Sequence, residues 1–403
     1  MSANYKKIQF ISWELNTGPF VSGTINRKTL GFYAGVRVSA TDDRTDALSQ
    51  CLDVDARVAF TADALEKAYK LADSSADTLK VFMGPEFLYR GAGGAYLHDL
   101  INGWVAEAPA ELHLPPPYSG KWGGLFGGLQ ELAADDRFGD WLFVFGSAIS
   151  ASFKPYKAPD GKYYLDPSAP GEIYNTSLIQ RGSAAGANDN YASRKQYISG
   201  IDFLDWYVNV PAHSAGTVLP LDPRAVVPID AMGVCEGGAV FSIDNVNDGS
   251  GAKLTFGIEI CLDHALSNND TNHWGRIRTA DKYVKVQLVP SGGMTLMDAS
   301  IRLLPAGAAT PNSYAFNCDG LGDLAHAYGC HTQVWNGANG AVVPLANKLY
   351  EASNGAALAH TNVAPVVSNV VIHGATVNAS ALWNNGMLQH GSGSVRVTPV
   401  LAL

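Results

Sequence analysis

Short apolar segments that end abruptly at polar residues are the feature that most constrains the fold of this chain. Uninterrupted segments of this kind lie at 78–83 (TLKVFM), 141–146 (WLFVFG) and 253–260 (KLTFGIEI). Such segments are typical of strands that are buried on both faces of a sheet. Between a first expected strand at 7–15 and the strand at 78–83, residues 60–72 carry apolar side chains at helical spacing. Strands that alternate with helices predict an α/β fold.

The length of 403 residues fits either one elaborated domain or two. No internal repeat is visible and the expected strands continue to about residue 345, so we favour one domain over 1–345. Stretches without a sustained period, most of them rich in Gly or Pro, predict insertions at 16–57, 90–124, 151–171 and 201–236. Residues 346–403 are expected to form a C-terminal extension that packs on the same domain or on a partner subunit.

Composition and charge exclude several classes of protein. Hydrophobic residues make up 47% of the chain and charged residues 16%, which excludes general disorder. A net charge of −9 without any Lys/Arg cluster argues against nucleic acid as a partner. No apolar run is long enough for a signal peptide or a membrane span, and the 5 cysteines form no disulfide framework or zinc pattern. We therefore expect a cytoplasmic protein with reduced thiols and no membrane contact.

Three of the expected strands end at a reactive polar group. These groups are Glu86 after VFMGP, Lys195 after YASR and Cys261 after LTFGIEI. Because ligands of open α/β sheets bind at the carboxyl ends of strands, the three side chains can converge on one pocket. A carboxylate can accept the thiol proton, an ammonium can hold developing oxyanion charge, and the sulfur can attack. Together they form a candidate nucleophilic set.

The segments that carry these residues resemble, in order, the nitrilase superfamily of carbon–nitrogen hydrolases. The matching segments are 84–87 (GPEF), 174–179 (YNTSLI) leading to Arg194-Lys195, and 257–263 (GIEICLD), with flanking matches at 142–147, 288–292 and 328–330. The resemblance covers roughly residues 5–345. It implies a four-layer α-β-β-α sandwich with long loop insertions, a homodimer or larger homo-oligomer, and no metal or cofactor.

The resemblance also implies a role for each site residue. Glu86 would act as general base and acid, Cys261 would form a thioester, and Lys195 with the backbone N–H of Leu262 would stabilise the oxyanion. Members of the family often carry a second glutamate a few residues after the lysine, and this chain has none there. Asp202 lies at about that offset and is either an auxiliary acid or a helix cap.

The residues after the nucleophile favour an amide over a nitrile substrate. Nitrile hydrolysers of the family tend to carry Trp-Glu there, whereas this chain has Leu262-Asp263. The expected reaction is therefore hydrolysis of a small linear amide or carbamoyl compound by water. Nitrile hydrolysis and acyl transfer on the same triad are the enzymatic alternatives. A binding or assembly protein with a spent site is the non-enzymatic alternative.

Several other polar residues are better explained by structural roles. Glu259 points to the same strand face as Cys261 by period-two alternation, and we favour a structural charge there. His264 and His273 with Asp263 suggest a metal, but their spacing fits no zinc pattern, so no metal site is expected. Inert buried thiols are expected at Cys51, Cys235, Cys318 and Cys330.

Overall fold

The structure is a computed structural model in which most of the chain is described. The described residues are 3–18, 20–25, 28–32, 47–91, 95–152, 155–157, 159, 163–165, 172–197, 237–265, 275–304, 312–320, 331–337, 347–352, 361–383 and 391–403. Among them, no helix combines the length and the apolar composition that crossing a bilayer requires.

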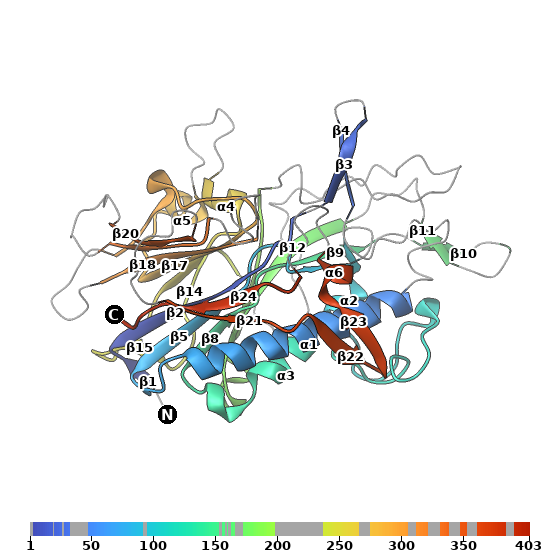
Figure 1. The fold of residues 1–403 in the computed structure, drawn as a ribbon, viewed down its shortest axis with the longest axis horizontal. Coiled ribbons are helices and arrows are strands. Elements are labelled where there is room, and N and C mark those ends of the chain that lie inside the picture. Colours follow the sequence, from blue (N-terminus) through green and yellow to red (C-terminus); the bar gives the residue numbers. More distant parts are fainter. Residues whose placement is uncertain are drawn as a thin grey trace.

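A large mixed sheet dominates this part of the chain (Figure 1). Its central strands β2, β5 and β8 pair in parallel, whereas β12 pairs antiparallel with both β8 and β9. Across the sheet the strands are β21 (Asn362–Pro365), β24 (Ser394–Val397), β2 (Lys7–Glu14), β5 (Thr78–Met83), β8 (Trp141–Val144), β12 (Glu172–Arg181), β9 (Ala148–Ser152) and β6 (Tyr89–Arg90). Three more strands pair at its margins: β13 (Asn190–Arg194), β25 (Leu401–Ala402) and β7 (Tyr96–Leu97).

A smaller sheet packs against the large one. Its strands β16, β17 and β18 are parallel, and β14, β19 and β20 pair antiparallel at its two sides. In order they are β14 (Val240–Phe241), β16 (Phe256–Ile258), β17 (Val286–Ser291), β18 (Tyr314–Asp319), β19 (Gln333–Asn336) and β20 (Asn347–Glu351). Separate two-stranded pairs are β1 (Ala3–Tyr5) with β15 (Val246–Asp248), β3 (Phe20–Ile25) with β4 (Lys28–Phe32), β10 (Pro155–Lys157) with β11 (Tyr163–Leu165), and β22 (Asn369–Ile372) with β23 (Ala375–Asn378).

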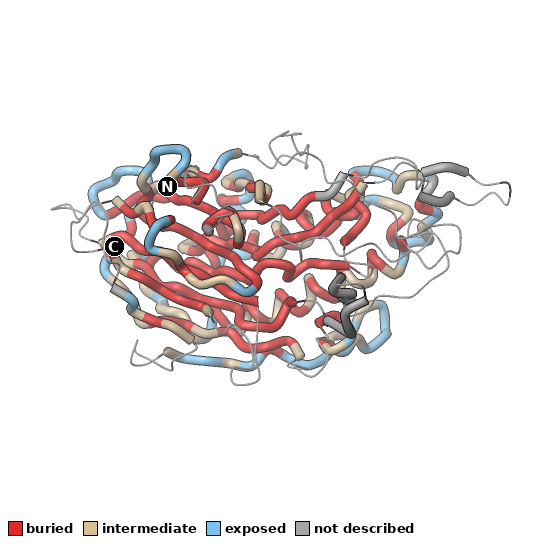
Figure 2. Tube along the Cα trace, turned by 90° about the horizontal axis from the view of Figure 1, so that it is seen from above, coloured by how far each residue is buried: buried red, intermediate tan, exposed pale blue. Residues whose placement is uncertain are grey.

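The two sheets share a core because side chains alternate along each strand. On β2, Phe10 faces the smaller sheet, and its ring lies 5.6 Å from that of Tyr314 and 4.9 Å from that of Phe316. The next residue, Ile11, belongs to a second core on the opposite face. Buried strand segments fill the interior in Figure 2, and exposed segments lie at the periphery.

Helices cover the outer face of the large sheet. The long helix α1 (Ala47–Leu71) and α3 (Gly124–Ala133) bury their apolar faces in the second core. Both lie below the large sheet in Figure 1. The short helices are α2 (Asp99–Asn102), α4 (Leu262–Ala265), α5 (Arg276–Thr279) and α6 (Ala379–Leu382). The described residues thus form a mixed α/β fold with two facing sheets. On the far face of the smaller sheet, Ile277 of the one-turn helix α5 packs in a third core. A fourth layer of long helices is not seen among the described residues, so the four-layer sandwich stays a prediction.

The predicted strands before and around the site residues are confirmed within a few residues, but two predictions are wrong. The insertion predicted over 16–57 is not all loop, because it contains β3 and β4 and because α1 begins at Ala47 and not near residue 60. Asp53 and Arg57 interrupt the apolar pattern of the first turns of α1. They form an ion pair one helical turn apart, with Arg57 Nε 2.8 Å from Asp53 Oδ1. The apolar spacing over 125–138 also predicts a helix, but the observed helix α3 is shorter and ends at Ala133. The apolar segment 341–343 (AVV) also predicts a strand, and it lies outside the described residues.

The C-terminal segment adds strands to the large sheet. β24 pairs antiparallel with β2, placing Val395 opposite Trp13, and β21 continues the sheet beyond β24. Val395 and Val397 are buried in the core between the large sheet and α1. These strands were not expected from the sequence, because each is only four residues long and lies in a Gly/Asn/Ala-rich stretch.

The packing between the sheets predicts a large effect of Phe10→Ala. The substitution removes a ring that contacts two aromatic side chains of the opposite sheet, and it should lower the free energy of unfolding by about 3–5 kcal/mol. Urea denaturation measures the change. Val371→Ala, at a side chain that is 67% exposed, is the control and should stay within about 0.5 kcal/mol of the wild type. Equal effects of the two substitutions would contradict this view of the core.

Candidate active site

Glu86 and Lys195 form a buried ion pair between two segments of the large sheet. Glu86 follows β5, and Lys195 follows β13. The Lys195 Nζ donates a hydrogen bond to Glu86 Oε1 at 2.8 Å, and the two side chains are 1% and 0% exposed. The carboxylate and the ammonium predicted from the sequence are therefore in direct contact.

Asn175 on β12 holds both members of this pair. Its Nδ2 donates to Glu86 Oε1 at 2.9 Å, and its backbone carbonyl accepts from the Lys195 N–H at 2.8 Å. In the sequence, Asn175 is part of the matching segment 174–179 and has no role of its own. The antiparallel pairing of β12 with β13, which places Thr176 opposite Arg194, is the signal that brings Asn175 next to Lys195.

A turn supported by Ser147 sets the position of Glu86. The Phe87 N–H donates to Ser147 Oγ at 3.0 Å, and Phe87 itself has a φ of +62°. The hydroxyl of Thr17 donates to the Glu86 carbonyl at 2.5 Å. Glu86 and the residue after it are thus held by the segments that follow β2 and β8.

Cys261 lies at a sharp turn between β16 and α4. Its φ of +50° is uncommon for a residue with a side chain, and such strain is often found at functional sites. The Cys261 N–H donates to the Pro290 carbonyl at 3.0 Å, and the Glu86 N–H donates to the next carbonyl, that of Ser291, at 3.1 Å. Two successive carbonyls at the end of β17 therefore anchor the thiol residue and the carboxylate residue.

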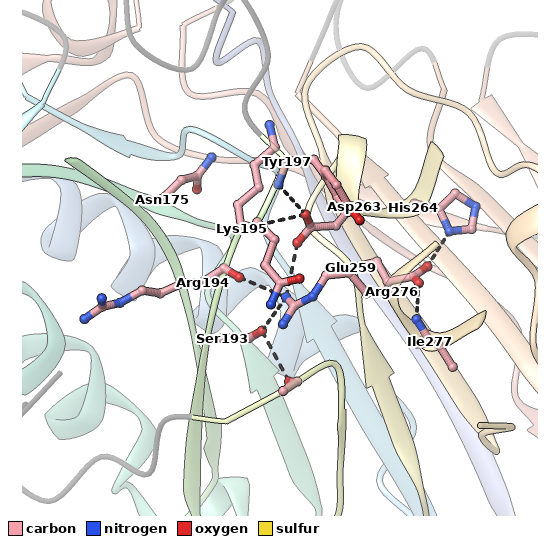
Figure 3. A network of polar contacts seen from close by, with 12 residues as sticks. Asn175, Ser193, Arg194, Lys195, Tyr197, Glu259, Asp263, His264, Arg276 and Ile277 are labelled. Carbon is pink, nitrogen blue, oxygen red and sulfur yellow. Dashed lines mark hydrogen bonds and ion pairs between the residues drawn. The ribbon is translucent and has the colours of Figure 1, made fainter. Parts of the chain in front are cut away.

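Asp263 connects the cysteine segment with the lysine segment (Figure 3). Its Oδ1 accepts the N–H groups of Gln196 and Tyr197 at 2.8 and 2.9 Å, and Arg276 Nη1 lies 3.2 Å from Oδ2. Burial raises the pKa of Asp263, and the neighbouring Arg276 opposes this rise. The sequence pattern relates Asp263 to the substrate class and to a rejected metal site, and it does not predict this contact.

Glu259 and His264 form a second buried pair behind the turn. His264 Nδ1 lies 2.6 Å from Glu259 Oε2, and the Met297 N–H donates to His264 Nε2 at 3.0 Å. Since Nε2 accepts a hydrogen bond, we assign the proton to Nδ1, which donates to Glu259. The other oxygen of Glu259 accepts the Ile277 N–H at 2.7 Å. These bonds tie α4 to α5, as expected for a structural charge.

The remaining site predictions have different outcomes. Leu262 is the first residue of α4, so its backbone N–H follows the cysteine directly. Asp202, His273, Cys235 and Cys330 lie outside the described residues. Cys51 and Cys318 are buried, and burial raises the pKa of both thiols. Within the described part of the chain, no group of three or more His, Cys, Asp or Glu side chains is arranged to hold a metal ion.

Comparison with known proteins finds distant structural neighbours. No protein-family model matches the chain, and no curated protein matches it. Among solved structures it is similar to Saccharomyces cerevisiae Nit3, a member of branch 10 of the nitrilase superfamily, at 14% identity over 84% of this chain and 86% of that chain, with a TM-score of 0.32. It is also similar to an N-terminal amidase solved with an Asn-Glu-Ala peptide, at 14% identity over 71% of this chain and 48% of that chain, with a TM-score of 0.28. At these scores neither likeness carries weight for the activity.

The site predicts that Cys261 is the most reactive of the described thiols. At neutral pH iodoacetamide should alkylate Cys261 faster than Cys51 or Cys318, whose raised pKa values leave little thiolate. Peptide mapping by mass spectrometry after short exposures measures the three rates. Cys261→Ala should remove the fast phase. Equal rates at the three thiols would show that Cys261 is an ordinary buried cysteine.

Proposed function

We propose that this chain is a carbon–nitrogen hydrolase of the nitrilase superfamily that cleaves a small amide or carbamoyl compound. The observation that carries the proposal is the anchoring of Glu86 and Cys261 to successive carbonyls of β17, with Lys195 bonded to the Glu86 carboxylate. The order of the matching sequence segments supports it independently. A binding protein would not require a thiol residue at positive φ and a buried acid–cation pair anchored to the same strand end.

In the proposed reaction the thiol forms a covalent intermediate. Glu86 removes the proton of Cys261, and the sulfur attacks the amide carbon. Lys195 and the Leu262 N–H stabilise the tetrahedral oxyanion. Glu86 then protonates the departing nitrogen, which leaves as ammonia or an amine, and a thioester remains. Glu86 next removes a proton from water, and the resulting hydroxide attacks the thioester carbon. The sulfur leaves and takes that proton from Glu86, which restores the thiol.

The finer predictions of the sequence belong to the same proposal. We infer a four-layer α-β-β-α sandwich, which the two facing sheets and the helices on one outer face support. A homodimer or larger homo-oligomer, a cytoplasmic location and an auxiliary role for Asp202 stay predictions. Acyl transfer would use the same thioester and differs from hydrolysis only in that an amine, and not water, attacks it.

The triad predicts loss of turnover in two substitutions. Cys261→Ala should abolish ammonia release from a screen of primary amides and carbamoyl compounds, because the sulfur is the only covalent participant. Glu86→Gln should lower kcat by about 10²–10⁴-fold, since it removes the general base and acid together. A coupled ammonia assay measures both, and circular dichroism checks that each variant is folded. Wild-type turnover by Cys261→Ala would refute the nucleophile assignment.

The choice of amide over nitrile is tested with side-chain-matched substrates. An amide presents an oxygen to the oxyanion site and needs a proton on its leaving nitrogen, whereas a linear nitrile must first form a thioimidate. Ammonia release that depends on Cys261 should be at least about tenfold weaker with the nitrile, equivalent to roughly 1.4 kcal/mol in barrier height. Nitrile turnover as fast as amide turnover would move the chain to the nitrile-hydrolysing branch.

A further inference from the structure

Four of the residues around Lys195 are held by one buried ion pair between helices α4 and α5. Asp263 Oδ1 accepts the N–H groups of Gln196 and Tyr197, which follow the lysine. Arg276 Nη1 donates to the Arg194 carbonyl at 2.9 Å and to Ser193 Oγ at 3.2 Å. Both of these residues directly precede Lys195. The pair itself, with Arg276 Nη1 3.2 Å from Asp263 Oδ2, is 6% and 0% exposed.

The same ion pair is part of the segment that carries the nucleophile. Asp263 lies two residues after Cys261, and the Asp263 N–H donates to the Ile260 carbonyl at 3.0 Å, across the strained cysteine. A shift of Asp263 must therefore move the turn that holds the thiol. Figure 3 shows the Asp263 carboxylate lying between the Arg276 guanidinium and the Tyr197 segment.

We propose that Asp263 and Arg276 act as one positioning unit that fixes the distance between the nucleophile Cys261 and the ammonium of Lys195. The inference rests on the proposed function, because it assigns these residues to the same reaction. Neither residue is proposed to touch the substrate. Asp263 acts through the backbone on both sides, and Arg276 holds its second oxygen in place.

The geometry explains why a short acid suits this position. The Asp263 carboxylate already bonds two successive N–H groups and an arginine, so its oxygens are directed at the lysine segment and not at a substrate. A glutamate would place the carboxylate one methylene further from the helix and push residues 196–197 away from the turn. Because misplacement of reacting groups by about 1 Å can cost about 10²-fold in rate, this contact can control kcat.

The test compares Asp263→Asn with Asp248→Asn. Asp248 is a matched control, because its carboxylate also accepts two backbone N–H groups, those of Ser250 and Ala252 at 2.8 and 3.1 Å. It is the last residue of β15 and lies outside the candidate site. We normalise kcat to the amount of protein whose Cys261 reacts with iodoacetamide. On this basis Asp263→Asn should lower kcat by about 10- to 100-fold with little change in KM. Asp248→Asn should leave kcat unchanged. If Asp263→Asn does not fold, Arg276→Lys is the milder variant, because it keeps the charge but removes Nη1, which makes the contacts with Asp263, Arg194 and Ser193.

A second readout follows the lysine without any substrate. Acetylation of Lys195 by acetic anhydride, mapped by mass spectrometry, should be several-fold faster in folded Asp263→Asn or Arg276→Lys than in the wild type. If neither kcat nor Lys195 acetylation changes in a folded variant, the positioning unit is refuted. If acetylation rises but the wild type shows no turnover that depends on Cys261, the positioning unit stands and the proposed hydrolase function fails.

Discussion

A carboxylate and an ammonium removed from water set the central constraint on this structure. Burying either charge alone is costly, so the Glu86–Lys195 pair is stable only if neighbouring donors and acceptors complete its hydrogen bonds. Asn175 contributes by donating from Nδ2 to Glu86 Oε1, the oxygen that also binds Lys195, and its backbone carbonyl accepts the backbone N–H of Lys195. The arrangement of strands around the pair follows from that requirement.

The two facing sheets make this arrangement possible. The large sheet supplies Glu86, Asn175 and Lys195, while the smaller sheet supplies Cys261 on the turn after β16. The end of β17 joins the two groups, because its last carbonyls accept hydrogen bonds from the cysteine and the glutamate. The site thus lies where the carboxyl ends of strands from both sheets meet, in agreement with the general rule for α/β proteins.

The sequence predicted the parts of the fold that have strong local patterns. The strands before Glu86 and Cys261 lie in short, continuous apolar segments, so their ends could be located within a few residues, and with them the candidate nucleophile and acid. The first turns of α1 were missed because paired charges such as Asp53 and Arg57 break the apolar period. The contacts of Asp263 with the lysine segment could not be predicted, since the two backbone N–H groups that it accepts lie 67 and 66 residues away in the sequence.

Trapping of the covalent intermediate tests the central claim most directly. The wild-type protein, incubated briefly with a primary amide and quenched in acid, should gain the mass of one acyl group less one hydrogen on the peptide that contains Cys261. Glu86→Gln should accumulate less of this adduct, because it lacks the base that activates the thiol. An adduct on another residue, or ammonia release with no adduct at Cys261 under single-turnover conditions, would contradict the account.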